Sequence, residues 1–158
     1  MFHFEIPRLV RAGGAMTITS TNWRIEVLLN FTIPIEPQGK KVPRITRNGN
    51  FKDPETRAAM EAIADAVRRQ YQGEPLDGPL RILITAWRTR PKAKPNAVWA
   101  DTKPDYDNVE KLIGDALEGI LWVNDSRIVD GRCLKKYAPK DVRGWIEIEV
   151  ELLDLRAG

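Results

Sequence analysis

Alternating apolar and polar residues predict four strands in this chain. From Trp23 to Ile33 nearly every second residue is apolar, and Pro34 ends the run. The clearest alternation lies at 146–152, where isoleucine, valine and leucine alternate with three glutamates. Shorter runs predict strands at 80–88 and 127–136.

Two segments have the 3.6-residue spacing of amphipathic helices. Asp53-Pro54-Glu55 supplies an N-cap, a proline at the first helical position and an acid in the first turn. The first helix is therefore predicted from there to about Tyr71. The second is predicted from about Asp107 to Leu121. The order β-α-β-α-β-β predicts an α/β (α+β) fold, in which two helices pack on one mixed sheet.

The length of the chain fits one domain. It has 158 residues, of which 42% are hydrophobic, enough to build a single core. Residues 1–20 show no sustained period and contain Gly13-Gly14, so we interpret them as a disordered extension before a domain at 21–158. Segments 34–52 and 89–104 are rich in proline and predict irregular loops.

Scarce histidine and cysteine narrow the possible chemistry. His3 is the only histidine and falls in the predicted extension, and Cys133 is the only cysteine. Histidine-dependent triads, zinc sites and internal disulfides are therefore not expected. Any catalysis is expected to rest on carboxylates, lysine and a hard metal ion. We interpret Cys133 as a small buried apolar residue. With no secretory signal or long apolar run, we expect a cytoplasmic protein without a membrane partner.

Positive charge is concentrated in the two predicted loops. The net charge is only +3, which is weak evidence for a nucleic-acid partner. Open basic loops suit contacts with phosphates, although a solvated surface explains them equally well. Trp99 could stack on an unpaired base, although a partly buried loop anchor is the favoured interpretation. The candidate DNA contacts are Lys40, Lys41, Arg44, Arg47, Arg88, Arg90, Lys92, Lys94 and Lys103.

A short acidic motif stands directly before the second predicted helix. Asp105 and Asp107 would point to the same side of an extended segment, where both could face one cation such as magnesium. Lys111, one turn later, could stabilise charge on a phosphate. The same residues could instead form a capping-box variant from Asp107 to Glu110 and an Asp107–Lys111 surface pair. Asp125 could be only a turn residue.

These residues stand in an order that resembles the RusA family of Holliday-junction resolvases. The family pattern is D-x-D-N, a lysine four residues after the second acid, D-A-L on the same helix and an acid in the following turn. The stretches from Ile33-Pro34 to Pro43-Arg44 and at Lys135-Lys136-Tyr137 agree more loosely. The segments that match closely are Asp105-Tyr106-Asp107-Asn108-Val109-Glu110-Lys111, Asp115-Ala116-Leu117 and Trp122-Val123-Asn124-Asp125-Ser126-Arg127-Ile128-Val129.

The resemblance implies a function and a site. Asp105, Asp107 and Asp125 are implied to bind Mg²⁺, with Mn²⁺ as a substitute, and Lys111 to be required for catalysis. It also implies a homodimer that acts on four-way DNA junctions. The chain departs from the family where Asn124 replaces the first of two adjacent acids, and where Lys103-Pro104 replaces an arginine.

The sequence therefore predicts a magnesium-dependent endodeoxyribonuclease of DNA recombination and repair, with no small organic cofactor. The nearest rival hypothesis is the same chemistry on another branched or flapped DNA. A non-catalytic DNA-binding module is a second rival, but it leaves the acids beside DNA unexplained. A structural protein-interaction domain is a third, and it leaves the basic loops unexplained.

Overall fold

The computed structural model describes residues 15–18, 25–41, 44–46, 49–51 and 53–153. The strands and helices are β1 (Ala15–Ile18), β2 (Ile25–Ile33), β3 (Arg44–Thr46), β4 (Gly49–Phe51), α1 (Pro54–Gln70), β5 (Leu80–Arg88), α2 (Tyr106–Leu117), β6 (Ile128–Tyr137) and β7 (Trp145–Leu153), with a short 3₁₀ turn, η1, at Asp125–Arg127. None of the helices in these ranges is long and apolar enough to cross a membrane.

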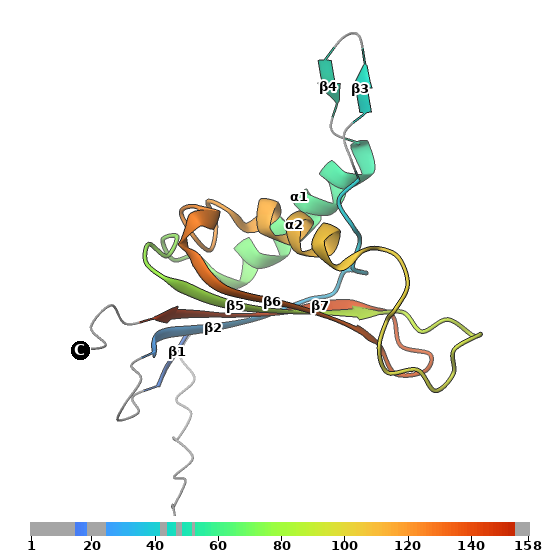
Figure 1. The fold of residues 1–158 in the computed structure, drawn as a ribbon. Coiled ribbons are helices and arrows are strands. Elements are labelled where there is room, and N and C mark those ends of the chain that lie inside the picture. The colour runs from blue at the N-terminus through green and yellow to red at the C-terminus, as the bar shows by residue number, and fades with distance from the viewer. Residues whose placement is uncertain (1–14, 19–24, 42–43, 47–48, 52, 154–158) are drawn as a thin grey trace, which may run out of the picture.

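One mixed sheet forms the base of the molecule. Its strand order is β1-β2-β7-β5-β6, in which β5 and β6 run parallel and every other neighbouring pair is antiparallel. Both helices lie on one face of this sheet (Figure 1). The predicted α+β fold, with two helices on a mixed sheet, is confirmed.

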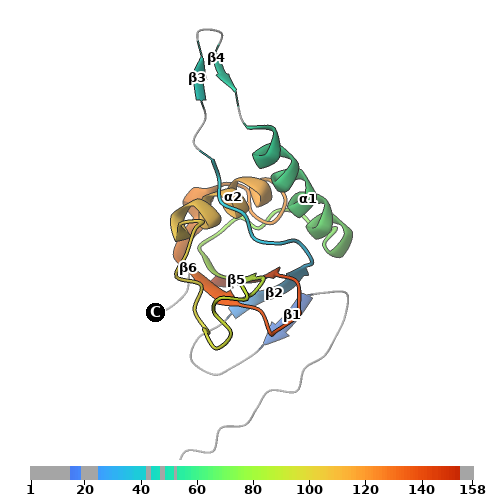
Figure 2. The same ribbon diagram turned by 90° about the vertical axis from the view of Figure 1, so that its right-hand side faces the viewer.

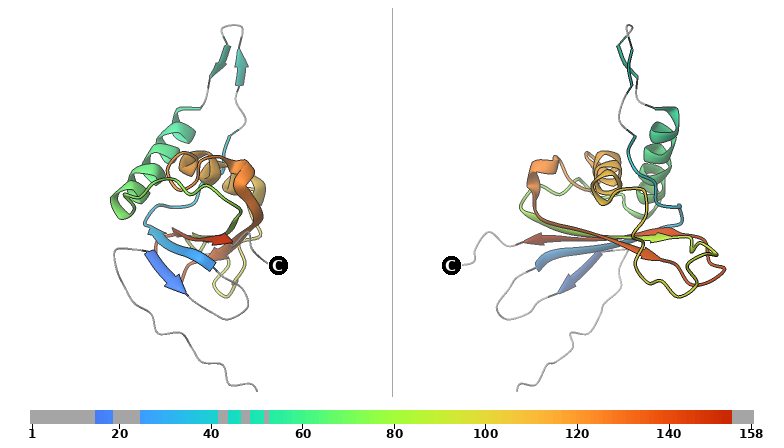
Figure 3. Two further views of the ribbon diagram at one scale, coloured as in Figure 1. Left: turned by 90° about the vertical axis from the view of Figure 1, so that its left-hand side faces the viewer. Right: turned by 45° about the vertical axis from the view of Figure 1, so that its right-hand side comes forward.

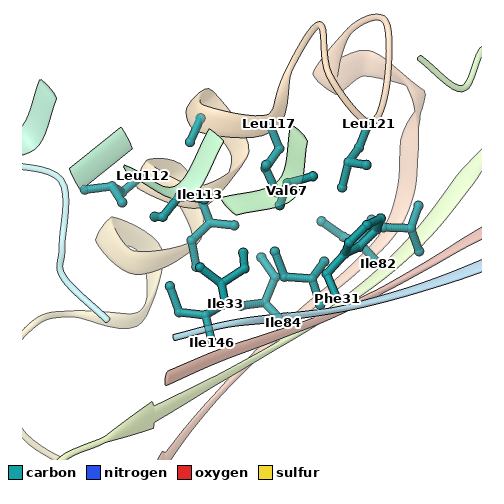
Figure 4. Packing of buried hydrophobic residues seen from close by; sticks show 14 of the residues in the cluster. Phe31, Ile33, Val67, Ile82, Ile84, Leu112, Ile113, Leu117, Leu121 and Ile146 are labelled. Atoms are coloured by element: carbon teal, nitrogen blue, oxygen red, sulfur yellow. The ribbon is translucent and has the colours of Figure 1, made fainter. Parts of the chain in front are cut away.

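The core fills the space between the sheet and the two helices. Alternate residues of β2, β5 and β7 meet the apolar sides of α1 and α2, as Ile33, Ile84 and Ile146 do beneath Ile113 (Figure 4). Helix α1 begins as predicted, because the Asp53 side chain accepts a hydrogen bond of 3.2 Å from the Thr56 amide. Alternation places the apolar residues of each strand on one face of the sheet, and helical spacing places those of each helix on one side. These two apolar surfaces therefore face each other and form the core.

Two predictions of irregular structure are wrong in part. The predicted extension at 1–20 contains β1, which pairs antiparallel with β2, whereas residues 1–14 and 19–20 lie outside the described residues. The predicted loop at 34–52 contains the antiparallel pair β3 and β4, which projects beyond the start of α1 (Figure 2). Strands of three or four residues are too short to show a period.

Helix α2 ends four residues earlier than predicted. Gly119 adopts a φ of +80°, where a glycine is tolerated without strain, and its amide bonds the Trp122 carbonyl at 2.7 Å. Leu121 and Trp122 are nevertheless fully buried. The apolar spacing continues past the helix because these side chains enter the core from a turn.

Residues 34–41 form a strap that leads from β2 across the start of α2. The Lys40 amide donates to the Asn108 carbonyl at 2.8 Å. Gly39 packs so closely on Pro104 that a Cβ there would overlap its ring. Farther back, the Glu36 carboxylate accepts hydrogen bonds from the Thr89 and Gly144 amides, each at 3.0 Å. The strap thus fixes the beginning of α2 against the sheet.

Cys133 lies on β6 and packs against the core, partly buried. Burial, with a smaller contribution from Glu110, raises the pKa of its thiol to about 11. The thiol stays protonated at neutral pH, in agreement with its interpretation as an apolar residue.

Candidate active site

Helix α2 presents one side to solvent, opposite its buried side. Val109, Leu112 and Ala116 are buried against the core. Asp107, Lys111 and Gly114 follow each other at spacings of four and three residues, so they share the outward side. We call this side, together with the turn that packs on it, the α2 outer face.

Asp105 lies just before the helix, and its backbone is extended (φ −66°, ψ 149°). Its carbonyl accepts the Val109 amide at 3.1 Å, but its side chain caps no amide. The carboxylate instead pairs with Lys103 Nζ at 2.6 Å and stays about half exposed (51%). The acidic motif is therefore not one extended segment, because the helix already begins at Tyr106.

Asp107 sits in the first turn of α2 and not at the N-cap, so the capping-box interpretation is wrong. Its carboxylate accepts a hydrogen bond of 3.2 Å from Lys111 Nζ, and both side chains are exposed. This hydrogen bond is the main cause that holds the pKa of Asp107 below its ordinary value, against a smaller opposing effect of desolvation. The surface pair is present, and it places an ammonium group on the α2 outer face.

Asp125 enters the α2 outer face from η1. The indole Nε1 of Trp122, a fully buried residue, donates to Asp125 Oδ1 at 2.8 Å. The Asp125 amide donates to Glu118 Oε2 at 3.1 Å. Both carboxylate oxygens lie 3.9 Å from the point where a Cβ of Gly114 would stand. A buried tryptophan thus aims this carboxylate, and a glycine leaves space for it.

Sequence reasoning missed three of these residues: Gly114, Glu118 and Trp122. Gly114 and Glu118 follow Asp107 by seven and eleven residues, which is helical spacing, so the helix period alone could have placed them beside the acids. Trp122 stands in a segment that resembles the family pattern, but no sequence period indicated its contact with Asp125, because that contact depends on the turn at Gly119.

The three aspartates offer the donor type that a hard divalent cation prefers, because all their ligand atoms are carboxylate oxygens. Across the described ranges, however, no three acidic, histidine or cysteine side chains stand close enough to hold a metal ion. Asp105 and Asp107 are each paired with a lysine. The donor chemistry fits a divalent metal, whereas the arrangement shown is not a closed three-carboxylate site.

The two predicted DNA contacts of the first loop whose side chains the structure describes, Lys40 and Lys41, are paired within the protein. Lys40 forms an ion pair with Asp115 of α2. Lys41 pairs with Asp53 and Glu55 at the start of α1, and the hydrogen bond to Glu55 is the main cause that raises its pKa. The side chain of Arg44, on β3, and all of Arg47 lie outside the described residues.

The predicted DNA contacts of the second loop are of two kinds: cations that bind other groups of the protein, and a cation that is exposed to solvent. Arg88 donates to the Lys103 carbonyl, and Arg90 donates to the carbonyls of three residues, so both guanidinium groups hold the loop together. Lys94 pairs with Asp101, and the hydrogen bond between them raises the pKa of Lys94 and lowers that of Asp101. Lys92 is exposed.

Trp99 is not the partly buried loop anchor that the sequence favoured. It is 58% exposed, and Lys136 Nζ lies 5.3 Å from its ring centroid.

Comparison with known proteins gives two findings. Residues 34–151 match the family model described as endodeoxyribonuclease RusA. An uncharacterised protein of Bacillus subtilis (strain 168), YqaN, is 29% identical over 125 residues, which cover 70% of this chain and 88% of the relative. The span matched by the family model contains both helices and every aspartate of the candidate site.

Proposed function

Since the chain belongs to the RusA endodeoxyribonuclease family, we propose that it is a magnesium-dependent nuclease that resolves four-way DNA junctions in recombination and repair. Family membership already supports a nuclease that acts on branched DNA. The observation that supports the site is that Asp107, Lys111 and Asp125 share the α2 outer face: Lys111 contacts Asp107, and Asp125 packs beside Gly114 farther along the helix.

The proposed metal ligands are Asp105, Asp107 and Asp125. When bound, a divalent cation polarises the scissile phosphate and lowers the pKa of a water molecule. Mg²⁺ suits carboxylate oxygens, and Mn²⁺ is the expected substitute. Binding requires Asp105 and Asp107 to exchange their lysine partners for the cation. Exposed ion pairs contribute only about 0–1 kcal/mol, so this exchange costs little.

The side chains of this chain then have separate tasks. Trp122 keeps Asp125 in one orientation through its indole hydrogen bond of 2.8 Å. Lys111 stands between Asp107 and Gly114 on the helix, and its charge can face the phosphate once Asp107 no longer holds it. Lys103 and Lys92 are exposed cations near the start of α2 and on the preceding loop, and they are proposed to contact phosphates.

The first expected result is that cleavage requires a divalent metal. On a synthetic four-way junction, the protein should cut with Mg²⁺ or Mn²⁺ and lose cutting in EDTA, because every proposed ligand is an oxygen atom. Activity should return when excess Mg²⁺ is added. Full activity in metal-stripped buffer would contradict the proposed chemistry, and cutting of flapped DNA but not of junctions would favour flapped DNA as the substrate.

The second expected result is a homodimer with a preference for junctions. Two symmetric cuts in a junction call for two identical sites related by a two-fold axis, the commonest oligomer symmetry. Light scattering should give about twice the chain mass of 18.0 kDa. In a competition gel shift, a junction should displace the protein better than a linear duplex of equal length, since only the junction engages both sites. A protein that is strictly monomeric and shows no preference for junctions would contradict the proposed resolution of junctions, but not the nuclease activity.

A further inference from the structure

Four residues form one row across the sheet on the face away from the helices. Trp87 of β5 is the cross-strand partner of Trp145 on one side and of Lys136 on the other, and Trp99 bridges to Lys136. Directly opposed residues point to the same face of a sheet. Trp87 alternates with the core residues Ala86 and Ile84, so this row faces away from α1 and α2.

The row ends in an exposed aromatic ring. Trp87 and Trp145 are partly buried and stack with centroids 5.0 Å apart and an interplanar angle of 16°. Lys136 Nζ then lies 5.3 Å from the ring of Trp87 and equally far from that of Trp99. Trp99 ends the row with 58% of its surface exposed. An exposed tryptophan ring that has an ammonium group on one face can stack a planar ligand on its other face.

The backbone around Trp99 is held in place on both sides. The Ala100 amide donates to the Lys135 carbonyl at 3.0 Å, and the Tyr137 amide donates to the Val98 carbonyl at 2.9 Å. The Arg90 guanidinium binds the carbonyls of Pro95, Ala97 and Ala138 at 3.0, 2.6 and 3.0 Å. A backbone fixed in this way loses little conformational freedom when a ligand binds to the ring.

Cations surround this end of the sheet. The loop after β5 and the loop between β6 and β7 project from the same end (Figure 3). They carry Lys92, Lys140 and Arg143, all exposed, and within the described part of the chain none of these three pairs with a carboxylate. An aromatic ring beside unpaired cations matches a nucleobase with its neighbouring phosphates.

The same segment leads directly to the candidate site. Thr102 is fixed by the Lys135 ammonium, which donates to its carbonyl at 2.7 Å. Asp105 follows Trp99 by six residues, so the two lie at most about 20 Å apart. At about 3.4 Å per nucleotide along one strand of a duplex, this is about six nucleotides.

We propose that Trp99, supported by Lys136, stacks on an unpaired DNA base beside the site that cuts the strand. In a four-way junction the base stack is interrupted where the strands exchange, so a base there can leave its pair more easily than in an intact linear duplex, whose stack is continuous. This inference rests on the proposed function and adds a residue that distinguishes branched from linear DNA. A base that leaves its stack at the branch point regains a stacking partner on Trp99.

The test compares Trp99→Ala and Trp99→Phe with the wild type on oligo(dT), a four-way junction and a linear duplex. Loss of base stacking should weaken binding of Trp99→Ala to oligo(dT) and to the junction by about 5- to 150-fold. Trp99→Phe should retain most of the affinity, and linear duplex binding should not change. The salt dependence should also stay the same, because no charge is removed. Val98→Ala, which shortens the equally exposed neighbouring side chain, is the matched control.

The outcomes separate this inference from the proposed function. Suppose that the wild type cuts junctions and that Trp99→Ala binds oligo(dT) and junctions as tightly as the wild type does. The stacking role is then refuted, and the proposed nuclease function is not. An equal loss on the linear duplex also refutes it. A wild-type protein that binds none of the three DNA molecules overturns both proposals.

Discussion

Asp105→Asn, Asp107→Asn and Asp125→Asn should each reduce junction cleavage by more than about 100-fold, beyond the usual cost of losing a residue that only supports a metal ligand. Asparagine keeps the size of the side chain and removes the charge that would hold a cation. Affinity for the junction, measured by gel shift, should hold or improve, because a negative charge near phosphate is removed. A loss of cutting without a loss of binding is the signature of a catalytic carboxylate.

These three variants should remain folded. The ion pairs of Asp105 and Asp107 are exposed, and such pairs add little stability. In Asp125→Asn the amide oxygen can still accept the Trp122 indole proton. Asp65→Asn is the matched control, because Asp65 forms the same kind of exposed pair, with Arg68, on α1. If one of these variants cuts at the wild-type rate, the substituted aspartate is not a metal ligand and is only a surface or turn residue.

The sequence predicted the fold well where its periods were long. Strand β7 and helix α1 have nine and seventeen residues, so alternation or helical spacing repeats several times in each. In β1, β3 and β4 the strands have only three or four residues. Their pairing is decided by neighbours distant in the sequence, which no local pattern reports.

The sequence named candidate site residues, but it predicted only part of the contacts that these residues make. The spacing of Asp107 and Lys111 predicted their contact, because both lie on one helix. The partners of Asp105 and Asp125 could not be assigned in the same way. Lys103 was predicted as a DNA contact, and in the structure it pairs with Asp105. The Trp122–Asp125 hydrogen bond depends on how the chain turns after α2.

Charge counts could not show which loop cations bind groups of the protein itself. The segment at 88–104 contains five cations and one acid, which suggested a row of phosphate contacts. Arg90 instead binds backbone carbonyls that an irregular loop leaves without strand partners. The count of positive residues cannot tell a guanidinium that orders its own loop from one that faces solvent.

Lys111→Met should lower junction cleavage by about 100- to 1000-fold, the usual cost of removing one group that stabilises transition-state charge. Methionine keeps an unbranched side chain on the exposed side of α2 and removes only the ammonium. Affinity should fall slightly, since one positive charge near phosphate is lost. Arg68→Met is the matched control, because it removes an exposed cation that also pairs with an aspartate, on α1 and outside the α2 outer face.

The same variant should change the pH dependence of cleavage in a defined direction. The Lys111 hydrogen bond is the main cause that holds the pKa of Asp107 below its ordinary value. With that bond removed, the pKa of Asp107 rises, and its carboxylate takes up a proton at a higher pH than in the wild type. Because only the ionised carboxylate can hold a cation, the acid limb of the rate profile should move to higher pH in Lys111→Met. Lys111→Arg, which restores a positive charge, should move it back. An acid limb that stays in place, together with a normal rate, would show that Lys111 serves only as a surface partner of Asp107.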